Sequence, residues 1–101
     1  YAAIDKHQVD TIACFTTDGQ LATNKYAVLT DSKGIFGYQQ VAPIVKSDLL
    51  EKMPPAFSQI VNQVSALLTQ DAIITMNEAV QVEQKKRETV APAFLQANGL
   101  L

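Results

Sequence analysis

The stretch VDTIACFTTDGQL, residues 9–21, decides how the rest of the chain is interpreted. Its first part, residues 9–15, is a short run of mostly apolar residues, and Thr-Thr-Asp-Gly follows it directly. A short apolar run with turn residues beside it favours a buried strand over a helix. Residues 1–6 are typical of a helix, and a helix followed by a strand is typical of an α/β unit. The sequence therefore predicts an α/β fold in which this strand ends at a turn.

Two further segments have the composition of strands. Residues 26–30, YAVLT, form one of them, and the turn sequence TDSKG follows at residues 30–34. Residues 41–45, VAPIV, form the other, with Pro43 at the centre. Because proline has no N–H to donate to a ladder, we expect an edge strand or an extended crossover at this third segment.

The chain becomes helix-rich after residue 46. Ser47 favours an N-cap for a short helix that ends before Pro54 and Pro55. Two more helices are predicted beyond residue 69, the last with Thr89 as N-cap, Pro92 in its first turn and Gly99 at its C-terminal end. The residues after the prolines have helical spacing and predict a core-facing helix of three to four turns. That apolar stripe consists of Phe57, Ile60, Val61, Val64, Leu67 and Leu68.

Composition excludes several classes of function. The 101 residues carry a net charge of −2 and the eight basic residues are dispersed, so no broad basic surface for nucleic acid is expected. Cys14 and His7 are the single residues of their types, so we expect no metal site built on several cysteines or histidines and no nucleophilic triad. We also expect no cofactor and no enzymatic activity. No run of eighteen apolar residues appears. The chain opens on YAAIDKHQVD, which we interpret as the interior of a longer protein.

The residues alone leave the role of the turn and loop motifs open. Thr-Thr-Asp-Gly is a common turn, and Asp18 could cap a helix or bind a backbone amide as easily as contact a ligand. Tyr38 lies in a glycine-rich loop, where a tyrosine usually packs or stays half-exposed.

The motifs in combination are more specific. VDTIACFTTDGQL, then YAVLTDSKGIFGYQQVAPIV, then VAPAFLQANGLL resembles the substrate-binding proteins of osmoprotectant ABC importers, which bind glycine betaine, carnitine or choline. The resemblance covers nearly the whole chain but only about the last third of such a protein. It implies the C-terminal portion of a two-lobed periplasmic-binding-protein-like fold (type II). Residues 1–24 would end one lobe, residues 25–40 would cross the hinge, and residues 41–101 would belong to the other lobe.

The resemblance also implies a ligand site. A trimethylammonium group cannot donate a conventional hydrogen bond, so aromatic faces hold it, each contributing about 1–2 kcal/mol in a desolvated site. Tyr38 matches the family tyrosine expected to line this aromatic cage, and Phe15 is a second candidate. Thr16, Thr17 and Asp18 would approach the cleft. The chain departs from the family at Phe36-Gly37-Tyr38, where prolines tend to precede the tyrosine.

Two functions share this architecture. The first is the solute-binding component of an ABC importer, with a quaternary-ammonium ligand and permease subunits as partners. It would act outside the cytoplasm. It would be attached to the membrane only through an anchor or a fused permease that lies outside this chain. The second is the effector-sensing domain of a transcription regulator, which fold alone does not separate from the first.

Overall fold

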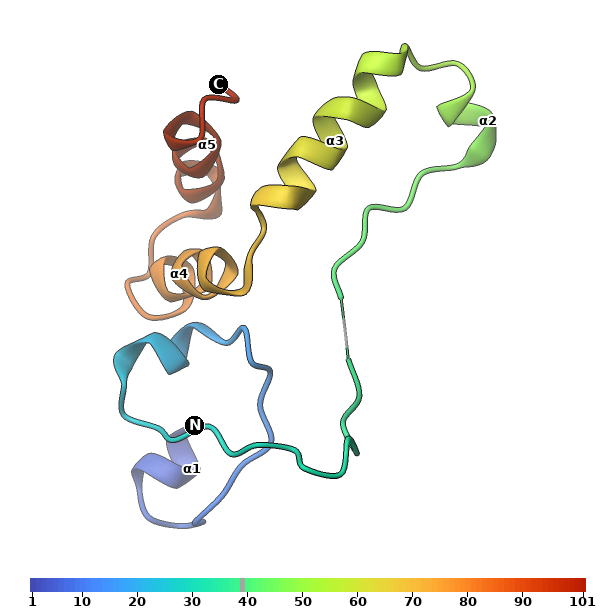
Figure 1. The fold of residues 1–101 in the computed structure, drawn as a ribbon. Helices are drawn as coiled ribbons and strands as arrows, with labels where there is room; N and C mark the ends of the chain where they lie inside the picture. The colour runs from blue at the N-terminus through green and yellow to red at the C-terminus, as the bar shows by residue number, and fades with distance from the viewer. Residues whose placement is uncertain (39) are drawn as a thin grey trace. The chain divides into compact units, whose positions relative to one another are not determined.

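The computed structural model describes residues 1–38 and 40–101, and over these residues the regular elements are all helical (Figure 1). Two short helices lie in the first half of the chain, and three helices of eleven to thirteen residues lie in the second. One 3-10 helix lies directly after the Thr-Thr-Asp motif. The elements in chain order are α1 (Ala2–Asp5), η1 (Gly19–Thr23), α2 (Ser47–Leu50), α3 (Pro55–Leu67), α4 (Gln70–Gln81) and α5 (Arg87–Ala97).

The predicted strands are not found in the described residues. Residues 9–15, 26–30 and 41–45 are irregular, with no ladder between any of them. A strand is stable only when a neighbouring strand satisfies its N–H and C=O groups, and no described segment supplies that partner. The side chains of Leu29 and Ile44 are 78% and 96% exposed, so these segments also lack a packed face. The α/β prediction is therefore confirmed only in its helix-rich second half.

The helix over Pro55–Leu67 confirms the prediction from apolar spacing. Pro54 is its N-cap and Pro55 its first residue, where the missing N–H costs no intrahelical bond. The prediction for α2 was wrong in its cap: Lys46 is the N-cap and Ser47 is already helical. The apolar stripe of α3 is not a closed core. Ile60 is 55% exposed, and no apolar side chain in the described part of the chain is fully buried.

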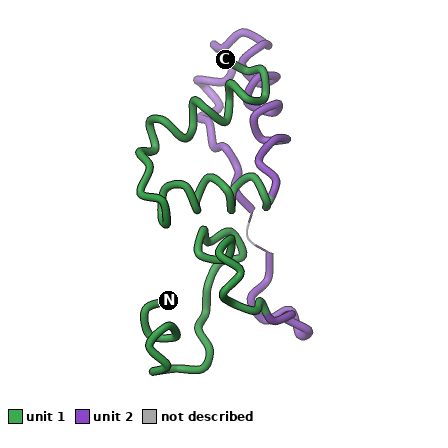
Figure 2. The backbone as a smooth tube through the Cα atoms, turned by 90° about the vertical axis from the view of Figure 1, so that its left-hand side faces the viewer, with its two compact units in different colours: residues 1–28, 70–101 green, residues 29–69 purple. Residues whose placement is uncertain are grey.

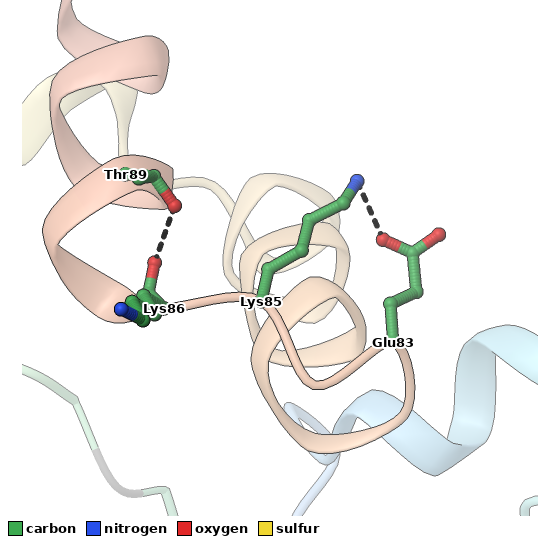
Figure 3. A network of polar contacts seen from close by, with 4 residues as sticks. All are labelled: Glu83, Lys85, Lys86 and Thr89. Atoms are coloured by element: carbon green, nitrogen blue, oxygen red, sulfur yellow. Dashed lines mark hydrogen bonds and ion pairs between the residues drawn. The ribbon is translucent and has the colours of Figure 1, made fainter.

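Helix α5 starts earlier than predicted. Lys86 is its N-cap, so Thr89 lies inside the first turn and its hydroxyl donates to the Lys86 carbonyl at 2.7 Å (Figure 3). Pro92 accordingly lies within the helix instead of in the first turn, where it cannot donate to the carbonyl of Glu88. In the connection before α5, Lys85 forms an exposed ion pair with Glu83 at 2.7 Å.

The C-terminal end of α5 confirms the prediction for Gly99. This residue has a φ of +70°, the left-handed conformation that glycine adopts without steric cost. The Gly99 N–H donates to the Gln96 carbonyl at 3.1 Å, and the Leu100 N–H donates to the Leu95 carbonyl at 2.9 Å. This pair of bonds is the Schellman motif, which satisfies carbonyls that the helix end would otherwise leave unpaired.

Contacts divide the chain into two compact units, coloured separately in Figure 2. Unit 1 consists of Tyr1–Val28 and Gln70–Leu101, and unit 2 of Leu29–Thr69. Within unit 1, α4 packs on both η1 and α5. Residue 39, which falls in the segment expected to cross a hinge, lies outside the described residues.

Candidate functional site

The loop of residues 15–19 is closed by Asp18. The Asp18 N–H donates to the Phe15 carbonyl at 3.0 Å, and the Phe15 N–H donates back to Asp18 Oδ2 at 3.3 Å. Asp18 is also the N-cap of η1, but its carboxylate makes no capping bond to that helix. Of the two structural roles open to this residue, binding a backbone amide is the one observed. The loop places Phe15, 63% exposed, beside the half-buried Asp18.

Two tyrosines support this loop and its surroundings. The Tyr1 hydroxyl donates to Asp18 Oδ2 at 2.8 Å, and the Tyr26 hydroxyl donates to Asp5 Oδ1 at 2.7 Å. The two rings meet edge to face, with centroids 5.2 Å apart and planes at 62°. Burial, followed by the bond to the Asp18 carboxylate, raises the pKa of Tyr1. The bond to Asp5 raises the pKa of Tyr26, so both hydroxyls remain protonated donors at neutral pH.

Helix α4 holds the same loop through three side-chain amides. Asn77 Nδ2 donates to the Thr17 carbonyl at 2.7 Å. Gln81 Oε1 accepts from the Gly19 N–H at 3.1 Å, and Gln70 Nε2 reaches the Thr16 carbonyl at 3.5 Å. Asn77 and Gln81 are four residues apart, and Gln70 is seven residues before Asn77, so all three lie on one face of the helix. The backbone of the candidate ligand loop is therefore bonded to α4 along its length.

Gly19 allows this close approach. It is buried, and a Cβ placed on it would lie 2.5 Å from the carbonyl carbon and 2.6 Å from the carbonyl oxygen of Asn77. Real Cβ atoms essentially never come within 3.0 Å of another heavy atom. Gly19 is not among the glycines with a positive φ. The lack of space for a side chain, and not the backbone conformation, therefore requires glycine at this position.

The second candidate segment, around Tyr38, belongs to unit 2. Asp31 organises it: Oδ2 accepts from the Phe36 N–H at 2.9 Å and Oδ1 from the Lys33 N–H at 3.3 Å. These amide bonds, that of Phe36 first, lower the pKa of Asp31. Gly34 and Gly37 both have a φ of +63°, which lets the chain turn twice before Tyr38. The Tyr38 side chain is fully exposed.

The structure thus brings four of the predicted site residues together in one loop, namely Phe15, Thr16, Thr17 and Asp18. Tyr38 belongs to the other unit, and each unit is described by itself. The supporting residues Tyr1, Asn77 and Gln81 were missed by sequence reasoning. The sequence pattern that could have indicated two of them is the spacing of Asn77 and Gln81, which are polar and four residues apart on a helix with an apolar stripe.

Other features of the described residues do not suggest a different site. Two shallow grooves of about 320 Å³ each are present: one is lined by Met76, Val80 and Val90 together with the loop-supporting Asn77 and Gln81, and one by Leu50 and Phe57 among others. Neither is lined by a predicted ligand residue. Residues 1–38 and 40–101 contain no group of three or more His, Cys, Asp or Glu side chains that could hold a metal ion. They also contain no helix long and apolar enough to cross a membrane.

Curated relatives match the chain over almost its full length. A glycine-betaine-binding protein of Pseudomonas aeruginosa is 31% identical over 100% of this chain and 32% of its own length. The carnitine transport binding protein OpuCC of Listeria monocytogenes is 26% identical over 97% of this chain and 32% of its own. The ergothioneine transport permease/ergothioneine binding protein EgtU of Helicobacter pylori is 28% identical over 99% of this chain and 18% of its own.

The chain therefore spans about a third or less of the length of these relatives. No solved structure matches it. The family model for the substrate binding domain of ABC-type glycine betaine transport systems matches residues 1–97. This match confirms the resemblance drawn from the motifs and the expectation that this chain belongs to a family of binding domains and not of enzymes. The chain belongs to this family of substrate-binding domains and forms part of such a domain.

Proposed function

We propose that the whole protein is the solute-binding component of an ABC importer that captures a quaternary-ammonium osmoprotectant such as glycine betaine, choline or carnitine. The observation that carries this proposal is the family match over residues 1–97, supported by relatives named for binding glycine betaine and carnitine. The same match favours transport over the effector-sensing domain of a transcription regulator.

The proposed ligand site has an aromatic part and a polar part. Tyr38 supplies a ring face to the trimethylammonium group, which attracts the cation without a hydrogen bond. Its full exposure in this chain supports the proposal, because no described side chain covers the ring. Phe15, also exposed, is the second aromatic face. Thr16, Thr17 and Asp18 contact the ligand from the loop that Asp18 closes.

We propose the lobes as residues 1–24 and 41–101, joined by a hinge at residues 25–40. Closure of the lobes then buries the ligand, and the closed form docks on the permease. The permease is a separate subunit or is fused to the binding domain, an arrangement consistent with the name of the Helicobacter relative. The binding domain works on the outer side of the membrane, because an importer collects its solute there. Any membrane attachment lies outside this chain.

A ligand series tests the proposal. The full-length protein is titrated by calorimetry with glycine betaine, choline, carnitine and glycine. Glycine shares the carboxylate of glycine betaine but carries a small, strongly hydrated ammonium, so it is the matched control. We expect saturable binding of at least one trimethylated compound and none of glycine at the same concentration. Equal binding of glycine, or no binding of any trimethylated compound, contradicts the proposal.

A further inference from the structure

We infer that Asn77 and Gln81 of α4 are positioning residues for the ligand loop, forming a polar clamp that fixes the orientation of Asp18. This assignment rests on the proposed function, because it concerns the loop that would contact the ligand. The polar clamp is defined by two bonds, from Asn77 Nδ2 to the Thr17 carbonyl at 2.7 Å and from the Gly19 N–H to Gln81 Oε1 at 3.1 Å.

The two bonds act on the two peptide groups that flank Asp18. The Thr17 carbonyl belongs to the peptide group before Asp18, and the Gly19 N–H belongs to the one after it. Each peptide group is planar, so the only soft backbone rotations between them are the φ and ψ of Asp18. Hydrogen bonds from one rigid helix to both peptide groups therefore restrict both dihedral angles of this residue.

The carboxylate of Asp18 is fixed as well. Tyr1 Oη at 2.8 Å and the Phe15 N–H at 3.3 Å both donate to its Oδ2. In the described part of the chain no hydrogen bond to Oδ1 is seen, which leaves this oxygen for a ligand. The clamp itself uses neutral amides, so it orients Asp18 without neutralising its charge. A ligand loop that is already in its bound shape loses less conformational entropy on binding.

The helix suits this role because its own backbone is hydrogen-bonded internally. An irregular loop has carbonyl and N–H groups without ladder partners, and side-chain amides can satisfy them. Asn77 and Gln81 lie at i and i+4, so their side chains emerge one above the other on the face of α4 that packs on η1. Buried Gly19 brings the two backbones close enough for these side chains to reach the loop.

The two hydrogen bonds run in opposite directions, and this difference provides a matched pair of variants. Asn77 must donate, whereas Gln81 must accept. Asn77→Asp replaces the donor with an acceptor that faces the Thr17 carbonyl. Gln81→Glu keeps an acceptor for the Gly19 N–H. Both variants have the native shape and add one negative charge to the same face of α4, and they differ chiefly in whether the hydrogen bond to the loop is kept. Gln81→Met removes the acceptor with little change in side-chain size.

The test measures glycine betaine affinity of the full-length variants by calorimetry, below their thermal unfolding midpoints. We expect Asn77→Asp and Gln81→Met to weaken binding at least tenfold and Gln81→Glu to stay within about twofold of the unmodified protein. Wild-type affinity in Asn77→Asp, or equal losses in Asn77→Asp and Gln81→Glu, overturns the assignment. A lowered unfolding midpoint with unchanged affinity of the folded protein shows a structural role only and also overturns it.

A second readout is independent of the ligand. The clamp predicts that the Gly19 amide exchanges slowly with solvent in the unmodified protein and in Gln81→Glu, and faster in Gln81→Met. If the unmodified protein binds no trimethylated probe, the proposed function fails. The exchange rate of the Gly19 amide then decides by itself whether the polar clamp forms. Fast exchange of Gly19 in the unmodified protein overturns it.

Discussion

At the scale of single residues, Gly19 sets how closely η1 and α4 approach each other. A Cβ at this position would collide with the backbone of Asn77, and backbone cannot rotate away as a flexible side chain can. We expect Gly19→Ala to destabilise the full-length protein by about 1–3 kcal/mol, the usual cost of overpacking. Denaturant unfolding measures this, with Lys25→Ala, an exposed position after η1, as the control. Equal midpoints for Gly19→Ala and the unmodified protein would contradict the packing described here.

The residues that hold the loop of residues 15–19 could not be predicted from the sequence. Tyr1 and Asp18 are 17 positions apart, Asn77 and Thr17 are 60, and Gly19 and Gln81 are 62. Local patterns contain no information about such pairs. The motif around Asp18 was identified because its own spacing is local, and the closure of the loop on Phe15 spans only three positions.

At the scale of elements, the loop before Tyr38 depends on the charge of Asp31. Amide bonds lower the pKa of this carboxyl below its ordinary value of about 3.9. The ionised Asp31 carboxylate accepts these amide bonds and so stabilises the folded state. This stabilisation is fully present above the pKa that Asp31 has in the unfolded chain, and it is lost as the pH falls through the lower pKa of the folded state. We therefore expect the pH titration of the Phe36 amide resonance to have its midpoint below about 3.9. A midpoint at or above that value would show that the Asp31 bonds do not form.

Helices were predicted more accurately than strands for a physical reason. The apolar spacing of α3 and the glycine after α5 are local signals, and both predictions are confirmed. A strand needs a partner from elsewhere, and the described residues contain none for residues 9–15 or 26–30. The cap positions were wrong by one residue at Ser47 and by three at Thr89, since a lysine with extended backbone precedes each helix.

At the scale of the whole molecule, residues 1–101 form part of a substrate-binding domain. It spans about a third or less of its curated relatives, and no apolar side chain in the described residues is fully buried. We expect residues 1–101 alone to bind glycine betaine at least tenfold more weakly than the full-length protein, because the proposed cage needs more aromatic faces than Tyr38 and Phe15 supply. Calorimetry on both proteins measures this. Equal affinity would place the complete site within these residues.

The proposed ligand site depends on an aromatic cage that includes Tyr38. The most direct measurement is the affinity of the full-length protein for glycine betaine in Tyr38→Ala, Tyr38→Phe and Phe36→Ala. Phe36 is a neighbouring exposed aromatic residue in the same loop and serves as the control. We expect at least a tenfold loss of affinity, about 1.4 kcal/mol, for Tyr38→Ala, and near-native affinity for the other two variants, because the cation is attracted to a ring face. Unchanged affinity in Tyr38→Ala would contradict the proposal that Tyr38 lines the cage.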